Sequence, residues 1–296
     1  MSCAAITALL DIPVQLGECP IWHAGEQALY WVDIPGQAVH RCNPSSRAHR
    51  TWPLPSEPGC IAFTEAGSLL VAMRHGIAIL DLDSGTLAPY LNAPYDPSAA
   101  RFNDGRCDAH GRLWVGSLYD PRDRPAATLY CLEQGRLTDH AMPATVSNGI
   151  AFSPDGQVLY RTDTTAHRID AYDFDVEKGT LSGKRLFHQF DRNRGPGYGG
   201  RPDGAAVDTE GAYWVAMYEG GRVVRLSPAG EIMQEIAVPA RCPTMVAFGG
   251  ADLRTLFITT ARFKRPQEEL DAFPLSGHVL SMPVEVAGLP ENTYRI

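Results

Sequence analysis

Four polar residues, Glu18, Asn103, Asn148 and Asp203, recur at one position relative to the segments that follow them. Each lies ten or eleven residues before a short apolar segment that is rich in aromatic and branched side chains. Two carboxylates and two carboxamides form an all-oxygen donor set, which suits Ca²⁺, Mg²⁺ or Mn²⁺ better than sulfur-preferring metals. Two carboxylates buried together are also costly without a cation. If the fold gathers these residues, they predict a divalent-metal site.

Three of these positions, taken alone, have a simpler interpretation as turns. Asn103 begins an Asn-Asp-Gly sequence, and both Asn148 and Asp203 are followed by glycine. Asn and Asp next to Gly are common turn formers. Because these three residues and Glu18 occur in phase, we favour convergence at a single site.

The elements that must position these residues belong to a repeat. Six apolar segments begin 40 to 54 residues apart, and several follow a glycine-containing turn. They span residues 29–34, 69–74, 113–118, 159–164, 213–218 and 256–261. A period in this range, with several short strands in each unit, is typical of a β-propeller. The sequence predicts an all-β, six-bladed β-propeller formed by residues 1–296 as a single domain.

Rotation about a propeller axis places residues of one phase in a ring at one mouth of the central channel. Glu18, Asn103, Asn148 and Asp203 are therefore expected to meet there. We also expect residues 4–10 to close the ring beside strands at 278–286, and a helical turn at 265–271. The glycine-rich segment 195–200 is expected to form a long loop over the channel mouth.

Composition and charge exclude several classes of protein. A net charge of −8 and a pI near 5.6 argue against nucleic-acid binding. No apolar stretch approaches the roughly 20 residues that span a membrane, and no signal peptide precedes Asp11. The seven cysteines show no CxxC spacing, which favours free thiols and a cytoplasmic location. They are Cys3, Cys19, Cys42, Cys60, Cys107, Cys131 and Cys242.

Five motifs that include these positions resemble those of the gluconolactonase/regucalcin (senescence marker protein) family. The resemblance extends from about residue 16 to residue 262, and the motifs occur in the same order as in the family. The motifs are Leu16-Gly-Glu-Cys-Pro-Ile-Trp22, Arg101-Phe-Asn-Asp-Gly105, Ser147-Asn-Gly149, Ser153-Pro-Asp-Gly156 and Arg201-Pro-Asp-Gly204. Together they are highly specific, although each is short.

The resemblance implies a six-bladed propeller with one divalent metal held by Glu18, Asn148 and Asp203. It implies substrate contacts from Arg101 and Asn103. Members of the family mostly open aldonolactones to aldonic acids, a step of carbohydrate metabolism, and this chain looks most similar to bacterial pentonate and hexonate lactonases such as xylonolactonases. It departs from regucalcin at Tyr119-Asp120, where regucalcin has an acidic pair.

Lactone hydrolysis requires a polarised carbonyl group, a positioned water and a proton acceptor. A metal serves as a Lewis acid toward the carbonyl oxygen, and Asp203 is the candidate general base. Arg101 and Asn103 are expected to bind the ring hydroxyls of the sugar or the developing carboxylate. Asp120 is expected either to hydrogen-bond a sugar hydroxyl or, equally, to be a solvated carboxylate in a turn. The metal is left open among Ca, Mg, Mn, Zn and Fe, and the protein is expected to be a monomer or a small homo-oligomer.

Two other functions stay open at this point. One is a metal-dependent phosphotriesterase or arylesterase, and the other is a non-catalytic calcium-binding propeller. Arg192, Arg194 and Arg201 also have two interpretations. They form a solvated edge, which we favour, or they receive an anionic substituent on the sugar.

Overall fold

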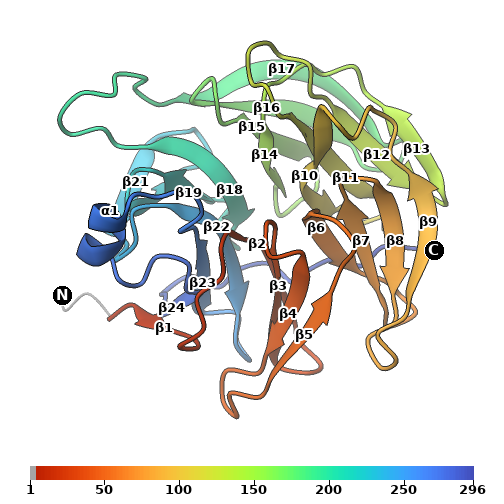
Figure 1. The fold of residues 1–296 in the computed structure, drawn as a ribbon. Helices are drawn as coiled ribbons and strands as arrows, with labels where there is room; N and C mark the ends of the chain where they lie inside the picture. Colours follow the sequence, from red (N-terminus) through yellow and green to blue (C-terminus); the bar gives the residue numbers. More distant parts are fainter. Residues whose placement is uncertain (1–4) are drawn as a thin grey trace.

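The computed structural model describes residues 5–296, which form six four-stranded antiparallel sheets arranged as blades around an axis (Figure 1). The predicted six-bladed all-β propeller is confirmed. Cys3, expected to be a free thiol, and Ala4, expected to begin the closing strand, lie outside the described residues. Among residues 5–296, no helix has the length and apolar character needed to cross a membrane.

In five blades the strands run in chain order from the axis outward. Blade 1 contains β2 (Gly17–His23), β3 (Ala28–Asp33), β4 (Ala38–Cys42) and β5 (His49–Pro53). Blade 2 contains β6 (Pro58–Phe63), β7 (Leu69–Met73), β8 (Gly76–Leu80) and β9 (Leu87–Asn92). Blade 3 contains β10 (Ala100–Cys107), β11 (Leu113–Tyr119), β12 (Leu129–Glu133) and β13 (Arg136–Asp139).

Blade 4 contains β14 (Ser147–Phe152), β15 (Val158–Asp163), β16 (Arg168–Asp175) and β17 (Thr180–Gln189). Blade 5 contains β18 (Arg201–Val207), β19 (Tyr213–Tyr218), β20 (Arg222–Leu226) and β21 (Ile232–Ala237). Blade 6 contains β22 (Pro243–Gly249), β23 (Thr255–Thr260), β24 (Leu280–Pro283) and β1 (Thr7–Ala8).

The ring is closed by the N-terminal strand, as predicted. Strand β1 pairs antiparallel with β24, with Thr7 opposite Ser281 and Ala8 opposite Leu280. The Leu9 N–H then donates to the Val279 carbonyl at 2.8 Å. Because one blade takes strands from both ends of the chain, the first and last blades are held together.

The six apolar segments of the repeat are the second strands of their blades, not the innermost ones. They correspond to β3, β7, β11, β15, β19 and β23. The innermost strands are buried at almost every residue, whereas the outermost β17 and β21 are largely exposed. Burial on both faces explains why most of the second strands read as nearly continuous apolar runs.

Every innermost strand carries a one-residue β-bulge. In β2, for example, Glu18 pairs with Val32 but Ile21 pairs with Tyr30, so one residue is extra. The same shift follows Phe102 in β10, Asn148 in β14 and Pro202 in β18. A bulge re-aims the side chains beside it. In these four strands, it falls next to the polar residue singled out by the repeat.

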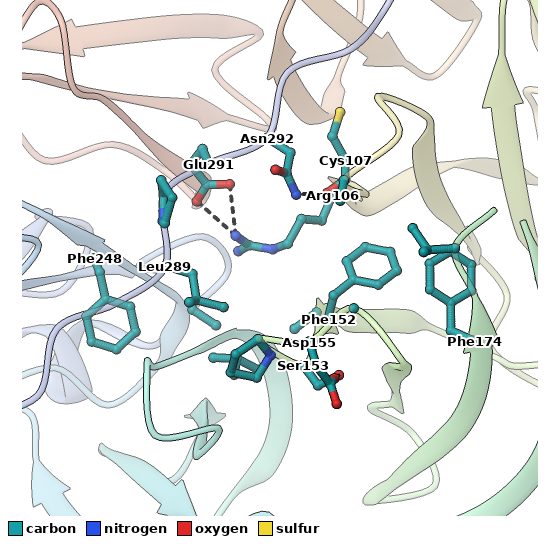
Figure 2. Close-up of a pocket in the computed structure, with 18 residues that line it drawn as sticks. Arg106, Cys107, Phe152, Ser153, Asp155, Phe174, Phe248, Leu289, Glu291 and Asn292 are labelled. Carbon is teal, nitrogen blue, oxygen red and sulfur yellow. Dashed lines mark hydrogen bonds and ion pairs between the residues drawn. The ribbon is translucent and has the colours of Figure 1, made fainter.

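The C-terminal segment crosses one end of the channel. The Thr209 N–H donates to Ala287 O, and the Tyr294 N–H donates to Phe63 O, so residues 287–294 link blade 5 to blade 2. Between these points, the guanidinium of Arg106 on β10 makes two hydrogen bonds of 2.8 and 2.9 Å to Glu291 (Figure 2). The chain therefore crosses this end of the channel, where a cavity of about 250 Å³ remains beside the segment (Figure 2).

The remaining local predictions have mixed outcomes. The expected helical turn is present as α1 (Gln267–Ala272), and the six described cysteines are free and buried. The loop of residues 195–200 does not cover the channel axis as predicted: none of these residues lines the cavities at the axis, and residues 195–198 line a separate cavity together with Glu219 and Arg265. Arg222 Nε, which donates to Gly199 O at 3.1 Å, holds this loop to the side of blade 5.

The closing strand suggests a test of stability. Leu9 is buried among Trp22, Phe257 and Val279, so Leu9→Ala leaves a cavity and is expected to lower the free energy of unfolding by about 2 to 5 kcal/mol. Urea unfolding followed by tryptophan fluorescence measures this. Ile12→Ala, at an exposed position just beyond the strand, is the control and should change the value by less than about 0.5 kcal/mol. Equal stability of the two variants would contradict a stabilising role for the closure.

Candidate metal and substrate site

The four residues of the repeat meet in one cavity at the end of the channel opposite the C-terminal segment. Glu18, Asn103, Asn148 and Asp203 come from β2, β10, β14 and β18, and all four are buried and line this inner cavity of about 80 Å³. The predicted convergence is therefore present. No group of three or more His, Cys, Asp or Glu residues suited to a metal occurs within residues 5–296, so carboxamides must contribute to any metal site here.

Blades 2 and 6 have no polar residue at the repeat position, and their residues there affect the site by packing. Gly59 on β6 lies so close to β10 that a Cβ atom there would collide with the Phe102 carbonyl and the Asn103 nitrogen. In blade 6 the equivalent residue, Met245, is fully buried. A side chain at position 59 would therefore push Asn103 out of place.

A chain of hydrogen bonds orients the two carboxamides. Asn103 Nδ2 donates to Ser147 O at 2.9 Å and to Asn148 Oδ1 at 2.5 Å. Asn148 Nδ2 donates to Thr164 Oγ1 at 2.8 Å and also to Asp203 Oδ1. The side chains of three blades thus form one connected network, in which each amide is held on both sides.

The backbone beside these residues adopts conformations that favour particular residue types. Gly149, directly after Asn148, has a left-handed φ of 56°, and a Cβ there would meet the Tyr213 hydroxyl and Thr162 Oγ1. Glycine is therefore required at this position. Cys19, directly after Glu18, has a φ of 45°, and its N–H donates to Glu18 Oε2 at 3.1 Å. In blades 1 and 4, the bulges therefore include a left-handed residue.

Burial strongly affects the acids of this site. It raises the pKa of Glu18, and the charges of Asp203 and Asp104 raise that pKa further. Burial also raises the pKa of Asp203, although Arg201 nearby acts in the opposite direction. Asp104, deeper in the channel, has a pKa raised by burial to about 6. Like charges withdrawn from water favour protonation unless a cation is present.

The donor atoms that face the cavity fit a divalent metal ion. Among the described residues, only the Cys19 N–H hydrogen-bonds to Glu18, and only Asn148 hydrogen-bonds to Asp203. Each carboxylate therefore keeps an oxygen with no hydrogen-bond donor from residues 5–296. Asn148 Oδ1 accepts one hydrogen bond and retains a second lone pair. These oxygens form the hard donor set that Ca²⁺, Mg²⁺ and Mn²⁺ prefer.

Two of the three predicted substrate residues border the inner cavity. Arg101 is buried, and its guanidinium donates to Asn103 Oδ1 at 2.7 Å and to Phe102 O at 2.9 Å. Asp120 lies farther out, where its Oδ2 accepts from Arg74 at 2.7 Å. Asp120 lines a wider cavity of about 620 Å³, the vestibule, that shares several lining residues with the inner cavity.

Several residues that line the site could not be identified from the sequence repeat. Arg122 and Tyr218 line both cavities, and Thr164 lines the inner one. Arg122 lies in the connection after β11, where it has no counterpart in other blades. Tyr218 ends a repeat strand, and position alone would have identified it as a rim residue. Of the three arginines considered from sequence, Arg201 borders both cavities, and the exposed Arg192 and Arg194 do not.

Comparison with known proteins shows the family to which the chain belongs. Residues 16–262 match the family described as SMP-30/gluconolactonase/LRE-like region. The chain is 46% identical over 283 residues to a 6-deoxy-6-sulfogluconolactonase of Pseudomonas putida, covering 95% of this chain and 96% of the relative. It is 35% identical over 259 residues to a pentonolactonase of Haloferax volcanii, covering 86% and 85%.

A solved structure extends the comparison to the fold. A calcium-binding protein, regucalcin, from Agrobacterium tumefaciens superposes with a TM-score of 0.93 at 28% identity, covering 99% of this chain and 98% of that one. The family predicted from the motifs is thereby confirmed. This six-bladed propeller belongs to the SMP-30/gluconolactonase/regucalcin family of sugar lactonases and their relatives.

Proposed function

We propose that this chain hydrolyses an aldonolactone to the aldonic acid with the help of one divalent metal ion. The observation that carries the proposal is the meeting of Glu18, Asn148 and Asp203 at the bottom of a cavity that Arg101 and Asn103 also line. The names of the relatives, a sulfogluconolactonase and a pentonolactonase, agree with this class of substrate. We favour Ca²⁺, Mg²⁺ or Mn²⁺ because all the available donors are oxygens.

Glu18, Asn148 and Asp203 would hold the metal, which when bound supplies a Lewis acid for the lactone carbonyl. The inner cavity is small, so it admits the reacting carbonyl and a water, and the rest of the sugar extends into the vestibule. Arg101 and Asn103 are held rigidly by their mutual hydrogen bond, which prepares them to bind ring oxygens or the carboxylate that develops.

Asp203 is the general base in this proposal. Its carboxylate accepts the proton of the attacking water, whose oxygen forms the new bond to the carbonyl carbon. The ring C–O bond then breaks, and Asp203 returns the proton to the ring oxygen, which becomes the hydroxyl of the open acid. The overall reaction consumes one water and, near neutral pH, releases one proton as the acid ionises.

The released proton provides the assay. Gluconolactone, xylonolactone, arabinonolactone and galactonolactone should acidify a weakly buffered indicator solution faster with the enzyme than without it. Chelation should abolish the difference, and re-addition of one metal at a time should identify the ion that restores it. Acceleration of a paraoxon-type ester alone would favour a phosphotriesterase, and metal binding without any hydrolysis would favour a calcium-binding protein.

Replacement of the base tests the mechanism. Asp203→Asn removes the proton acceptor, so we expect turnover to fall by a factor of about 10² to 10⁴ at saturating metal. Circular dichroism should remain that of the native protein, and calorimetry should report the metal occupancy at which the rate is measured. Asp123→Asn, at an exposed position beside Arg122, is the matched control and should retain the native rate. Near-native turnover of Asp203→Asn would remove the base assignment.

Metal binding without catalysis gives an independent test. Metal at one hundred times its dissociation constant stabilises a protein by about 2.7 kcal/mol, which raises the Tm of a chain of this size by about 4 °C. Glu18→Gln removes one charged ligand and should eliminate most of this rise. Glu65→Gln, whose native carboxylate pairs with Arg295 away from the site, should keep it. The same metal-induced rise in Glu18→Gln would exclude Glu18 as a ligand.

A further inference from the structure

The boundary between the inner cavity and the vestibule is rich in arginine. Six residues line both spaces, and three of them are arginines. They are Leu16, Ile34, Arg101, Arg122, Arg201 and Tyr218. Any molecule whose lactone carbonyl reaches Asp203 must therefore pass three guanidinium groups. We call Arg101, Arg122 and Arg201 the arginine collar.

The vestibule beyond the collar is also cationic, although the protein as a whole has a net charge of −8. Six basic and three acidic side chains line it. The basic ones are Arg74, Arg101, Arg122, Arg201, Lys264 and Arg265, and the acidic ones are Glu57, Asp120 and Glu219. An excess of positive charge in a concave surface concentrates anions there.

The acidic residues neutralise only part of this charge. Arg74 makes ion pairs with both Glu57, at 3.0 Å, and Asp120, at 2.7 Å. Arg265 makes ion pairs with Glu219 at 3.1 Å and with Glu269 at 2.5 Å. Two of the six cations thus engage all three acidic residues of the lining.

The other cations keep most of their capacity to bind an anion. Arg201 shares Glu219 with Arg194 and Arg265, and its Nε is buried without an acceptor. Arg122 and Lys264 are exposed and make no ion pair with the described residues. A neutral sugar gives no physical reason for such an arrangement.

We propose that the natural lactone carries an anionic substituent at its end remote from the carbonyl, and that Arg122 and Arg201, with Lys264 at the rim, bind it. This inference rests on the proposed function and specifies its substrate class. Arg101 is excluded from the role because its guanidinium is already directed to Asn103 Oδ1 and Phe102 O, within the part of the site that holds the lactone. The group is a sulfonate, a phosphate monoester or a carboxylate.

A matched set of lactones tests the inference. The set consists of gluconolactone and its analogues with a sulfonate, phosphate or carboxylate at carbon 6. At least one anionic lactone should have a kcat/KM exceeding that of gluconolactone by a factor of roughly 10 to 100, since hydrogen bonds to charged groups are worth that much. The preferred anion identifies the group. If none exceeds gluconolactone, the inference is overturned.

Variants assign the effect to residues. Arg122→Gln should lower the ratio of kcat/KM for the preferred anionic lactone to that for gluconolactone by at least about tenfold. The ratio guards against general damage, because a misfolded enzyme loses both activities together. Arg124→Gln is the matched control, since Arg124 lies in the same loop, stacks on Tyr119 and lines neither cavity. An unchanged ratio in Arg122→Gln would remove Arg122 from the role.

Equilibrium binding separates the substituent from the product carboxylate. Gluconate and the C6-anionic aldonate both carry the carboxylate formed by hydrolysis and differ only at carbon 6. Titration calorimetry should show tighter binding of the C6-anionic aldonate, with a difference that shrinks at high salt. Equal affinities would count against the inference. Failure of every lactone to react would instead reject the proposed function, so the two failures are distinguishable.

Discussion

Two carboxylates, Glu18 and Asp203, are buried in one small cavity at the propeller axis, and the rest of the site depends on that unfavourable arrangement. Burial raises the pKa of both, and each keeps an oxygen without a hydrogen-bond donor from the described residues. A protein built only for stability would place apolar residues there. The cost is offset if a divalent cation binds between the carboxylates, and such a cation is the centre of the proposed lactonase.

Strand β10 shows how one element serves both ends of the channel. It carries Arg101 at one end and Arg106 at the other, and both are largely buried. The C-terminal segment supplies Glu291 to Arg106 in a two-hydrogen-bond pair, so the charge of Arg106 is neutralised. At the opposite end no segment of the described chain supplies a carboxylate to Arg101 or Arg122. The same channel is thus crossed by the C-terminal segment at one mouth, beside a cavity of about 250 Å³, and holds the candidate ligand site at the other.

Rigidity and selectivity come from different layers of this site. The inner residues lie on bulged strands and are joined by hydrogen bonds through Asn103, Asn148 and Thr164, which suits a metal and a reaction that require fixed geometry. Arg122 and Lys264 lie outside the strands, where changes in loop sequence alter charge without disturbing the core. A common reaction centre with variable substrate recognition is the expected consequence.

The sequence by itself determined the number of blades, the closing strand and the gathering of Glu18, Asn103, Asn148 and Asp203. Rotational symmetry makes this possible, because it converts a repeated spacing along the chain into a repeated position around an axis. Only the tertiary structure decided the positions of residues without a counterpart in other blades. It placed Arg122 and Lys264 beside the site, paired Asp120 with Arg74, and placed residues 195–198 at a neighbouring cavity instead of over the channel axis. These positions follow from packing between loops of different blades, for which the repeat contains no information.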